Sequence, residues 1–355
     1  TAVSVSAGMR STCAILDNGD LKCWGHDNSG QLGDGGGILD NGSLLPLRHW
    51  SDQYTSEPSS TSVDLGTGRK AVSVDAGLFH VCAILDNGDL KCWGSDSNGQ
   101  LGDGDVSESD WINKVTAPSS TPVDLGTGRT AVAVAAGRGH TCAILDNGDL
   151  KCWGSDLSGA LGDGGSNTDL DTPPATAIDL GTGRTAVAVS AGDHRTCAIL
   201  DNGDLKCWGE GTRGLLGLGS TTSLSAPSST PIDLGTDRTA VAVSMADNAV
   251  CAILDNGDVK CWGSNTDGMV GIGVNQNYWY STPQGPLDFG TGRTAVAISG
   301  GYTGFCAILD NNDTMCWGSD DYGQVGDGGS NTDRRSPVSV SGSNTWDSST
   351  EFTQG

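Results

Sequence analysis

The chain has 355 residues, a formal net charge of −24 at pH 7 and an isoelectric point near 4.2. Nucleic acids and anionic membranes bind proteins through Lys and Arg. Here 19 such residues stand against 43 Asp and Glu, so we expect no nucleic-acid partner and no membrane insertion. With 55 glycines and no apolar run of membrane-spanning length, the sequence predicts short strands joined by turns and almost no helix.

Twelve cysteines divide into six pairs of constant spacing, and the pairs recur with a period of about 54 to 69 residues. That period accommodates one four-stranded blade of a propeller. Zinc sites more often show shorter spacings with matching histidines, whereas paired cysteines indicate disulfides and an oxidising compartment. The predicted disulfides are Cys13–Cys23, Cys82–Cys92, Cys142–Cys152, Cys197–Cys207, Cys251–Cys261 and Cys306–Cys316.

Each cysteine pair frames a hairpin, in which two apolar strands flank a turn such as residues 17–20, Asp-Asn-Gly-Asp. A two-residue Asn-Gly turn and a three-residue loop with Gly19 in the left-handed conformation are the two available registers. Only the three-residue loop places Cys13 directly opposite Cys23, at a Cα–Cα distance of about 4.5 Å that a disulfide can span. The sixth repeat has Asn312 at the turn glycine, and Asn tolerates a positive φ better than other non-glycine residues.

The remaining strands also repeat. Residues 131–137, Ala-Val-Ala-Val-Ala-Ala-Gly, alternate as a strand with small side chains, which suits the crowded axis of a propeller. The Ala-Ile-Leu run after each first cysteine is apolar on both faces, as expected for a sheet packed between two others. Residues 136–145, 149–154 and 159–162, with their Cys-Trp-Gly and Gly-Ala-Leu-Gly elements, resemble the repeat of the regulator of chromosome condensation (RCC1-like) family.

The resemblance recurs six times and implies an all-β fold, a β-propeller of six four-stranded blades with one disulfide inside each hairpin. The founding family usually has seven units, but a seven-bladed closure is less favoured because the chain has six repeats. We expect a single propeller domain over residues 1–340, followed by a polar tail or linker over residues 341–355. The expected repeats are about 1–70, 71–130, 131–185, 186–239, 240–294 and 295–340.

Aromatic residues outside the repeat pattern are candidates for ligand binding, because insertions in a propeller fall in loops. Such side chains could form a platform for sugar rings or an anchor for a protein partner, although they could equally cover loop cores. The predicted ligand-binding residues are Trp50, Tyr54, Trp111, Tyr278, Trp279 and Tyr280.

Acidic, glycine-rich loops are the candidates for calcium, the only cofactor that the sequence suggests, although ordinary Asx turns explain them as well. The candidate ligands are Asp103, Asp105, Asp163, Asp169, Asp327 and Asp333, and candidate glycosylation sites are Asn41 and Asn312. His80, His140 and His194 lie near first cysteines and are interpreted as structural. Asp64 and Arg69, which recur around a Gly-Thr-Gly turn, are interpreted as a turn-stabilising pair.

The leading functional hypothesis is a secreted or cell-surface recognition or adhesion module without catalytic activity. Its partner would be a protein or a carbohydrate on a surface. One alternative is a structural subunit of a surface fibre or of a larger surface protein, in contact with copies of itself. A further alternative is a hydrolase or lyase built on the propeller, but the sequence shows no catalytic constellation.

Overall fold

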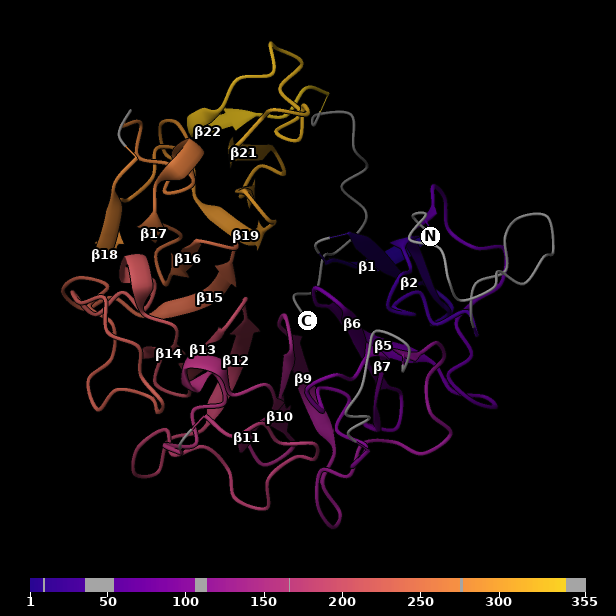
Figure 1. Cartoon of the computed structure of the whole chain (residues 1–355). Helices are drawn as coiled ribbons and strands as arrows, with labels where there is room; N and C mark the ends of the chain where they lie inside the picture. Colours follow the sequence, from indigo (N-terminus) through magenta and orange to yellow (C-terminus); the bar gives the residue numbers. More distant parts are fainter. Residues whose placement is uncertain (9, 36–53, 106–113, 166, 275–276, 343–355) are drawn as a thin grey trace. The chain divides into compact units, whose positions relative to one another are not determined.

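The structure is a computed structural model, and it describes residues 1–8, 10–35, 54–105, 114–165, 167–274 and 277–342. The chain divides into two compact units: unit 1 contains Thr1–Leu161 and Gly165–Ile178, and unit 2 contains Gly162–Gly164 and Asp179–Glu351. Each unit holds three antiparallel sheets, one for each sequence repeat (Figure 1). In the described ranges, no helix is long and apolar enough to cross a membrane.

Unit 1 contains the sheets of repeats one to three, coloured indigo to magenta in Figure 1. Its elements are β1 (Ala2–Ala7), β2 (Ser11–Leu16), β3 (Leu21–His26) and β4 (Tyr54–Thr55); β5 (Ala71–Ala76), β6 (His80–Leu85), β7 (Leu90–Ser95) and β8 (Lys114–Val115); and β9 (Ala131–Ala136), β10 (His140–Leu145), β11 (Leu150–Gly154) and the 3-10 turn η1 (Leu157–Gly159).

Unit 2 contains the sheets of repeats four to six. Its elements are β12 (Ala186–Ala191), β13 (Arg195–Leu200), β14 (Leu205–Gly209) and η2 (Thr212–Gly214); β15 (Ala240–Met245), β16 (Ala249–Leu254), β17 (Val259–Ser264), η3 (Thr266–Gly268) and β18 (Trp279–Gln284); and β19 (Ala295–Gly300), β20 (Gly304–Leu309), β21 (Thr314–Gly318) and β22 (Arg334–Ser339). Every sheet is built from consecutive strands, so among the described residues no strand is exchanged between the first and the last repeat.

The prediction of four strands in every repeat is wrong for the third and the fourth. There the outermost strand is reduced to one isolated bridge, Gly154 with Leu170 and Gly209 with Leu224. The second residue pair that makes a strand in the first two repeats, His26 with Tyr54 and Ser95 with Lys114, is not formed there. In the fifth repeat the pairing of β17 with β18 includes a register irregularity and extends past Pro283 to Gln284.

The three-residue hairpin loop is confirmed. In the first repeat Leu16 N donates to Asp20 O over 2.8 Å, and Gly19 has a φ of 82°. Cys13 pairs directly with Cys23 at a Cα–Cα distance of 4.1 Å. Asn312 has a φ of 66°, so it adopts the conformation that the turn requires. All six predicted disulfides are formed, and no cysteine is free.

In the second to fifth repeats, the strands that contain the first cysteine are buried on both faces, as the sequence predicts. In β6 the exposed fractions of Ala83, Ile84 and Leu85 are 0 %, 2 % and 1 %. Side chains of β2 and β3 form one apolar cluster with β5 and β6, and side chains of β16 and β17 form another with β20. The buried apolar area between consecutive sheets is therefore the main source of stability within each unit.

In the second, third, fifth and sixth repeats, the tryptophan of the Cys-Trp-Gly motif joins its sheet to the preceding one. Trp93 Nε1 donates to Gln31 O over 3.1 Å, and Trp153 Nε1 donates to Gln100 O over 3.1 Å. A Cβ on Gly102 would lie 2.5 Å from Trp153 Nε1, so the indole requires a glycine beneath it. The same junction recurs in unit 2, where Trp262 Nε1 donates to Leu215 O and Trp317 Nε1 donates to Met269 O.

The recurring arginines do not pair with the aspartates predicted for them. Asp64 Oδ1 accepts a hydrogen bond from Gly66 N and thereby stabilises its own turn. Arg69 Nη1 instead lies 3.3 Å from Asp86 Oδ1 of the next hairpin loop. The chain folds back beside the hairpin, so each recurring arginine contacts the aspartate of the following hairpin loop rather than the aspartate of its own turn. These arginines are Arg69, Arg129, Arg184, Arg238 and Arg293. Both partners are more than one third exposed, so each pair contributes about 0–1 kcal/mol.

The sixth disulfide should be the first to yield to a reductant. Cys306 is partly exposed, whereas the first cysteine of every other pair has an exposed fraction of 0 %. Disulfide exchange requires access of a thiolate to sulfur, so under native conditions Cys306–Cys316 should be reduced before the other five. Limited reduction, alkylation and peptide mass spectrometry check this order; simultaneous reduction of all six disulfides would contradict it.

Candidate functional site

The loops between the first and second strands of the sheets differ from repeat to repeat. The hairpin loop is Asp-Asn-Gly in five repeats and Asp-Asn-Asn in the sixth, so it presents the same chemistry each time. The connections before the second strands instead carry apolar, aromatic, basic and acidic residues. We name these connections the variable loops; they are residues 8–10, 77–79, 137–139, 192–194, 246–248 and 301–303.

In unit 1 consecutive variable loops lie against one another. Leu78 N donates to Gly137 O over 3.2 Å. A Cβ on Gly77 would lie 2.3 Å from the same Gly137 O, so glycine permits this close approach. On these adjoining loops Phe79 is half-buried and Arg138 is exposed. The variable loops therefore form a continuous surface within the unit.

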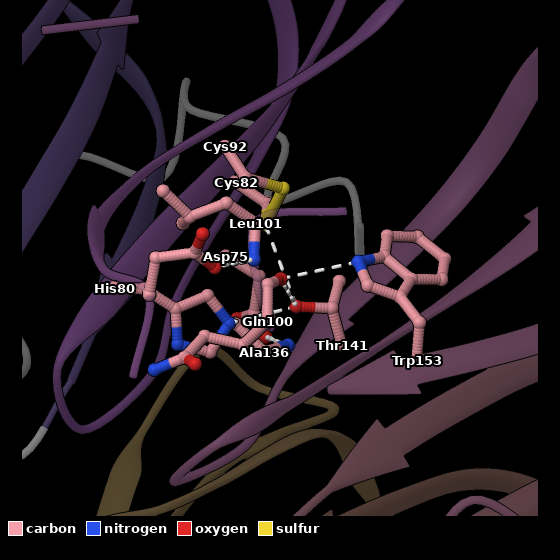
Figure 2. The surroundings of a disulfide bond; sticks show 10 residues. Asp75, His80, Cys82, Cys92, Gln100, Leu101, Ala136, Thr141 and Trp153 are labelled. Carbon is pink, nitrogen blue, oxygen red and sulfur yellow. Dashed lines mark hydrogen bonds between the residues drawn. A yellow bond between two sulfur atoms is a disulfide. The ribbon is translucent and has the colours of Figure 1, made fainter. Parts of the chain in front are cut away.

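A buried histidine, His80, links the second repeat to the third beside these loops. His80 Nε2 lies 2.8 Å from Thr141 Oγ1, and Thr141 Oγ1 donates to Gln100 O over 2.7 Å (Figure 2). Because the Thr141 hydroxyl donates its proton to Gln100 O, it accepts a hydrogen bond from His80 Nε2. The proton of the neutral His80 ring therefore lies on Nε2. Burial lowers the pKa of His80 to about 4, so the ring is neutral at physiological pH. His80 acts as an inter-repeat tether, in agreement with its structural interpretation.

In unit 2 an arginine occupies the position of His80. Arg195 is fully buried, and its Nη2 donates to Ala246 O over 2.6 Å and to Asp247 O over 2.5 Å. Burial lowers the pKa of Arg195, whereas the negative charge of Asp247 raises it. Arg195 therefore fixes the carbonyls of the next variable loop, as His80 fixes the next repeat in unit 1. His194, which the sequence analysis grouped with His80, lies one position away, with Nε2 3.5 Å from Asp193 Oδ2.

Polar side chains of the variable loops of unit 2 and of η2 lie near Arg195. We name Asp193, His194, Arg213, Asp247, Asn248 and Tyr302 the loop cluster of unit 2. Arg213 Nη1 donates to Asn248 Oδ1, Asn248 Nδ2 donates to Asp247 Oδ2, and Asp247 N donates to Tyr302 O over 3.2 Å. Burial, followed by the charge of Asp193, raises the pKa of Asp247. Tyr302 is 52 % exposed and lies beside these charges. An exposed aromatic among ordered polar groups is suited to recognition of a protein surface.

The predicted aromatic residues are not gathered at one place. Trp50 and Trp111 lie outside the described residues, and of Tyr54 only its backbone in β4 is described. Tyr278 and Trp279 are 64 % and 57 % exposed at the start of the outermost strand β18, and Tyr280 is half-buried. Ligand binding by this exposed pair stays a prediction.

The predicted calcium ligands make local contacts. Asp103 Oδ1 accepts from Asp105 N, Asp169 Oδ1 accepts from Asp156 N, Asp327 pairs with Arg334, and Asp333 Oδ1 accepts from Asp320 N. Asp163 is exposed. In the part of the chain that the structure describes, no group of three or more His, Cys, Asp or Glu could hold a metal ion.

Of the two predicted glycosylation sites, Asn41 lies outside the described residues and Asn312 is exposed. Calcium binding and glycosylation stay predictions.

The buried hydrogen-bonding roles of Arg195 and Asp96 were not predicted from the sequence. Arg195 stands two residues before a first cysteine, as His80 does, but the neighbouring His194 drew attention to the wrong position. Asp96 is 4 % exposed, and its Oδ1 accepts from Leu101 N over 2.9 Å. The recurrence of aspartate at this position could have revealed the role of Asp96, since Asp27, Asp156 and Asp320 accept the corresponding hydrogen bond in other repeats.

Comparison with known proteins supplies the family. The model "Regulator of chromosome condensation (RCC1) repeat" matches residues 2–31, 71–100, 131–160, 186–215 and 240–268, and a second model of the same description matches residues 87–144. The chain is 28 % identical to the ultraviolet-B receptor UVR8 of Arabidopsis thaliana over 338 residues, which cover 95 % of this chain and 69 % of that protein.

Solved structures agree with this assignment at the level of the fold. Human WBSCR16 superposes with a TM-score of 0.78 at 21 % identity, over 96 % of this chain and 82 % of that one. Yeast RCC1 (Prp20), solved bound to Kap60, superposes with a TM-score of 0.76 at 18 % identity, over 96 % and 75 % of the two chains. At these identities the similarity establishes an all-β propeller fold of this kind and nothing more specific.

Proposed function

Because the chain belongs to the regulator of chromosome condensation (RCC1) repeat family, we propose that it is a non-catalytic recognition module of the cell exterior, which binds a protein through its variable loops. The observation that carries this proposal is the contrast within each repeat. The disulfide-bonded hairpin keeps one sequence in nearly every copy, whereas the adjoining variable loop changes chemistry each time. Functional diversity in repeat scaffolds is expected where the repeats differ.

Two further observations support the proposal. Buried anchors, His80 in unit 1 and Arg195 in unit 2, hold the variable loops in fixed positions, and pre-organised loops lose less entropy when they bind. Six disulfides indicate a non-reducing environment, which favours a secreted or surface location over the cytosol. The yeast protein of the same fold binds Kap60, so a propeller of this kind is able to serve as a protein-binding scaffold.

The proposal is tested by binding of surface proteins from the source cell to the immobilised, oxidised chain. The triple variant Asp193→Ala, Arg213→Ala and Tyr302→Ala should weaken retention at least about tenfold, since a few anchor residues carry most of the affinity of an interface. The matched control is Tyr278→Ala with Trp279→Ala, which removes an exposed aromatic pair on β18 and should leave protein retention unchanged.

Thermal melts of each variant establish that the fold is retained. Equal retention by the wild type and the triple variant would reject the variable loops as the site in unit 2. A loss confined to the Tyr278/Trp279 variant, together with retention of glycans, would favour the carbohydrate-binding alternative.

A further inference from the structure

A cavity of about 280 Å³ lies beside β8, the short outermost strand of the second sheet. We name it the β8 cavity. Every residue that lines it belongs to unit 1; these residues come from the second repeat and, in Thr172, from the third. None of them belongs to the variable loops. The β8 cavity is therefore a separate feature of the surface, and its size is close to the lower limit for pockets that hold small ligands, about 300 Å³.

The second repeat has a small side chain at a position where the fourth and fifth repeats have larger ones. Val115, Leu224 and Tyr280 each pair with the glycine of the Cys-Trp-Gly motif in their own repeat. Each of the three side chains packs on the apolar cluster between its own repeat and the next. Valine is shorter than leucine or tyrosine, so the second repeat keeps space that the larger side chains occupy elsewhere.

The inner end of the β8 cavity is apolar. Leu101 and Val123 line it and are 2 % and 9 % exposed, and the half-buried Val115 lies with them in the cluster between the second and third sheets. Cys92, also in the lining, is closed into a disulfide with Cys82 and has no thiol to donate. The hydrocarbon part of a ligand loses its contact with water here, and each buried methylene strengthens binding.

The mouth of the β8 cavity carries two carboxylates. Asp103 and Asp124 both line the cavity and are exposed. Asp103 Oδ1 accepts from Asp105 N and Asp124 Oδ1 accepts from Gly126 N, which leaves the second oxygen of each carboxylate to a ligand. No lysine, arginine or histidine is among the described residues that line the cavity. The charge at the mouth is thus negative and favours a cation.

Hydroxyl groups complete the polar lining. Ser119 Oγ lies 3.1 Å from Thr121 Oγ1 and also accepts from Thr121 N. Thr172 Oγ1 donates to Asp171 Oδ1 over 3.4 Å, so its lone pairs remain for a donor. Carboxylate and hydroxyl oxygens are acceptors that suit the three N–H donors of an ammonium group.

We propose that the β8 cavity binds an aliphatic ammonium group, with the hydrocarbon stem against Leu101, Val115 and Val123 and the ammonium at Asp103 and Asp124. The apolar inner end and the anionic mouth match the two parts of such a ligand. The side chain of a lysine on another protein and a free alkylamine share this chemistry. The inference does not depend on the proposed function, because it uses neither the variable loops nor their ligand.

The test is an NMR titration of the full oxidised chain with ethyl-, butyl- and hexylammonium at low ionic strength, where exposed charges are least screened. Affinity should rise about fourfold for each added methylene until the cavity is full, the gain expected from burial of a methylene. Butanol has the stem of butylammonium without its charge and should bind at least about tenfold more weakly, because the charge-assisted hydrogen bonds are lost.

Two variants test the two ends of the cavity. Val115→Leu introduces the side chain that the fourth repeat has at this position, so hexylammonium should bind about fourfold more weakly while ethylammonium is unaffected. Asp103→Asn with Asp124→Asn keeps the acceptors for Asp105 N and Gly126 N but removes both charges, so all three amines should bind at least about tenfold more weakly. The matched control, Asp163→Asn with Asp179→Asn, removes the equivalent charges of the third repeat and should leave affinity unchanged.

A capped Gly-Lys-Gly tripeptide distinguishes the two sources of the ligand. Tighter binding of the tripeptide than of butylammonium assigns the cavity to a lysine of another protein, and the reverse assigns it to a free amine; either result supports the proposal. Circular dichroism establishes that each variant folds. Affinity that is independent of stem length, butanol that binds as tightly as butylammonium, or equal losses in the two double variants would each overturn the proposal, as would binding of calcium without a response to any amine.

Discussion

Replacement of Trp93 by alanine should lower the free energy of unfolding by about 3–5 kcal/mol, the range for a large aromatic removed from a packed core. Trp93 has an exposed fraction of 0 %, and it packs with Leu32, Val63 and Leu65 in the cluster between the first and second sheets. The variant also leaves Gln31 O without its donor, which adds to the cost. Urea unfolding followed by circular dichroism measures the change.

Trp24 is the matched control for this substitution, because it occupies the same position in the first repeat but is half-buried. Trp24→Ala should cost less than about 2 kcal/mol, since less apolar surface is removed from contact. Equal losses for the two variants would show that the junction of Trp93 with Gln31 does not stabilise unit 1 in the way that its burial indicates.

The hairpins and their disulfides could be predicted from the sequence because local geometry determines them. The turn residues and the requirement that Cys13 lie opposite Cys23 select one register, and the structure has that register. The same local logic places Asn312 at a positive φ. The repeats, counted from the cysteines, correspond one to one with the sheets. Each of these features depends on residues within one hairpin or on recurrence along the chain.

Features that join distant residues could not be predicted in this way. The partner of Arg69 is Asp86 of the next hairpin rather than Asp64 of its own turn, because the choice depends on how the connection folds back. Arg195 is buried because Ala246 and Asp247 of another repeat supply carbonyls, and a single repeat does not reveal them.

Replacement of Asp96 by asparagine should make the stability of unit 1 less dependent on pH. Burial raises the pKa of Asp96 to about 7, and the nearby carboxylates of Asp103, Asp105 and Asp171 add to the shift. The folded-state pKa thus lies above the unfolded-state value of 3.8, so this group stabilises the fold in its protonated form and the stabilisation is lost as pH rises toward 7.

Between pH 5 and pH 7 the wild type should therefore lose about 2 kcal/mol relative to Asp96→Asn, because the decline of about 1.4 kcal/mol for each pH unit levels off as the pH reaches the folded-state pKa. Asparagine keeps the acceptor for Leu101 N, and the fifth repeat already has this arrangement, with Asn265 Oδ1 accepting from Val270 N over 3.2 Å. The variant should accordingly be more stable than the wild type at pH 8 and closer to it at pH 5. Urea unfolding at pH 5, 6, 7 and 8 measures both curves.

Asp320→Asn is the control, because Asp320 holds the same position in the sixth repeat and accepts from Val325 N over 2.9 Å. Asp320 is also buried, so its replacement measures what the loss of a buried carboxyl at this repeated position does to the pH profile without the acidic surroundings of Asp96. If the two variants flatten the profile equally, the cause is common to buried carboxyls at this repeated position rather than particular to the acidic surroundings of Asp96. If Asp96→Asn alone flattens it, the burial of Asp96 beside Asp103, Asp105 and Asp171 sets the pH at which unit 1 is weakened.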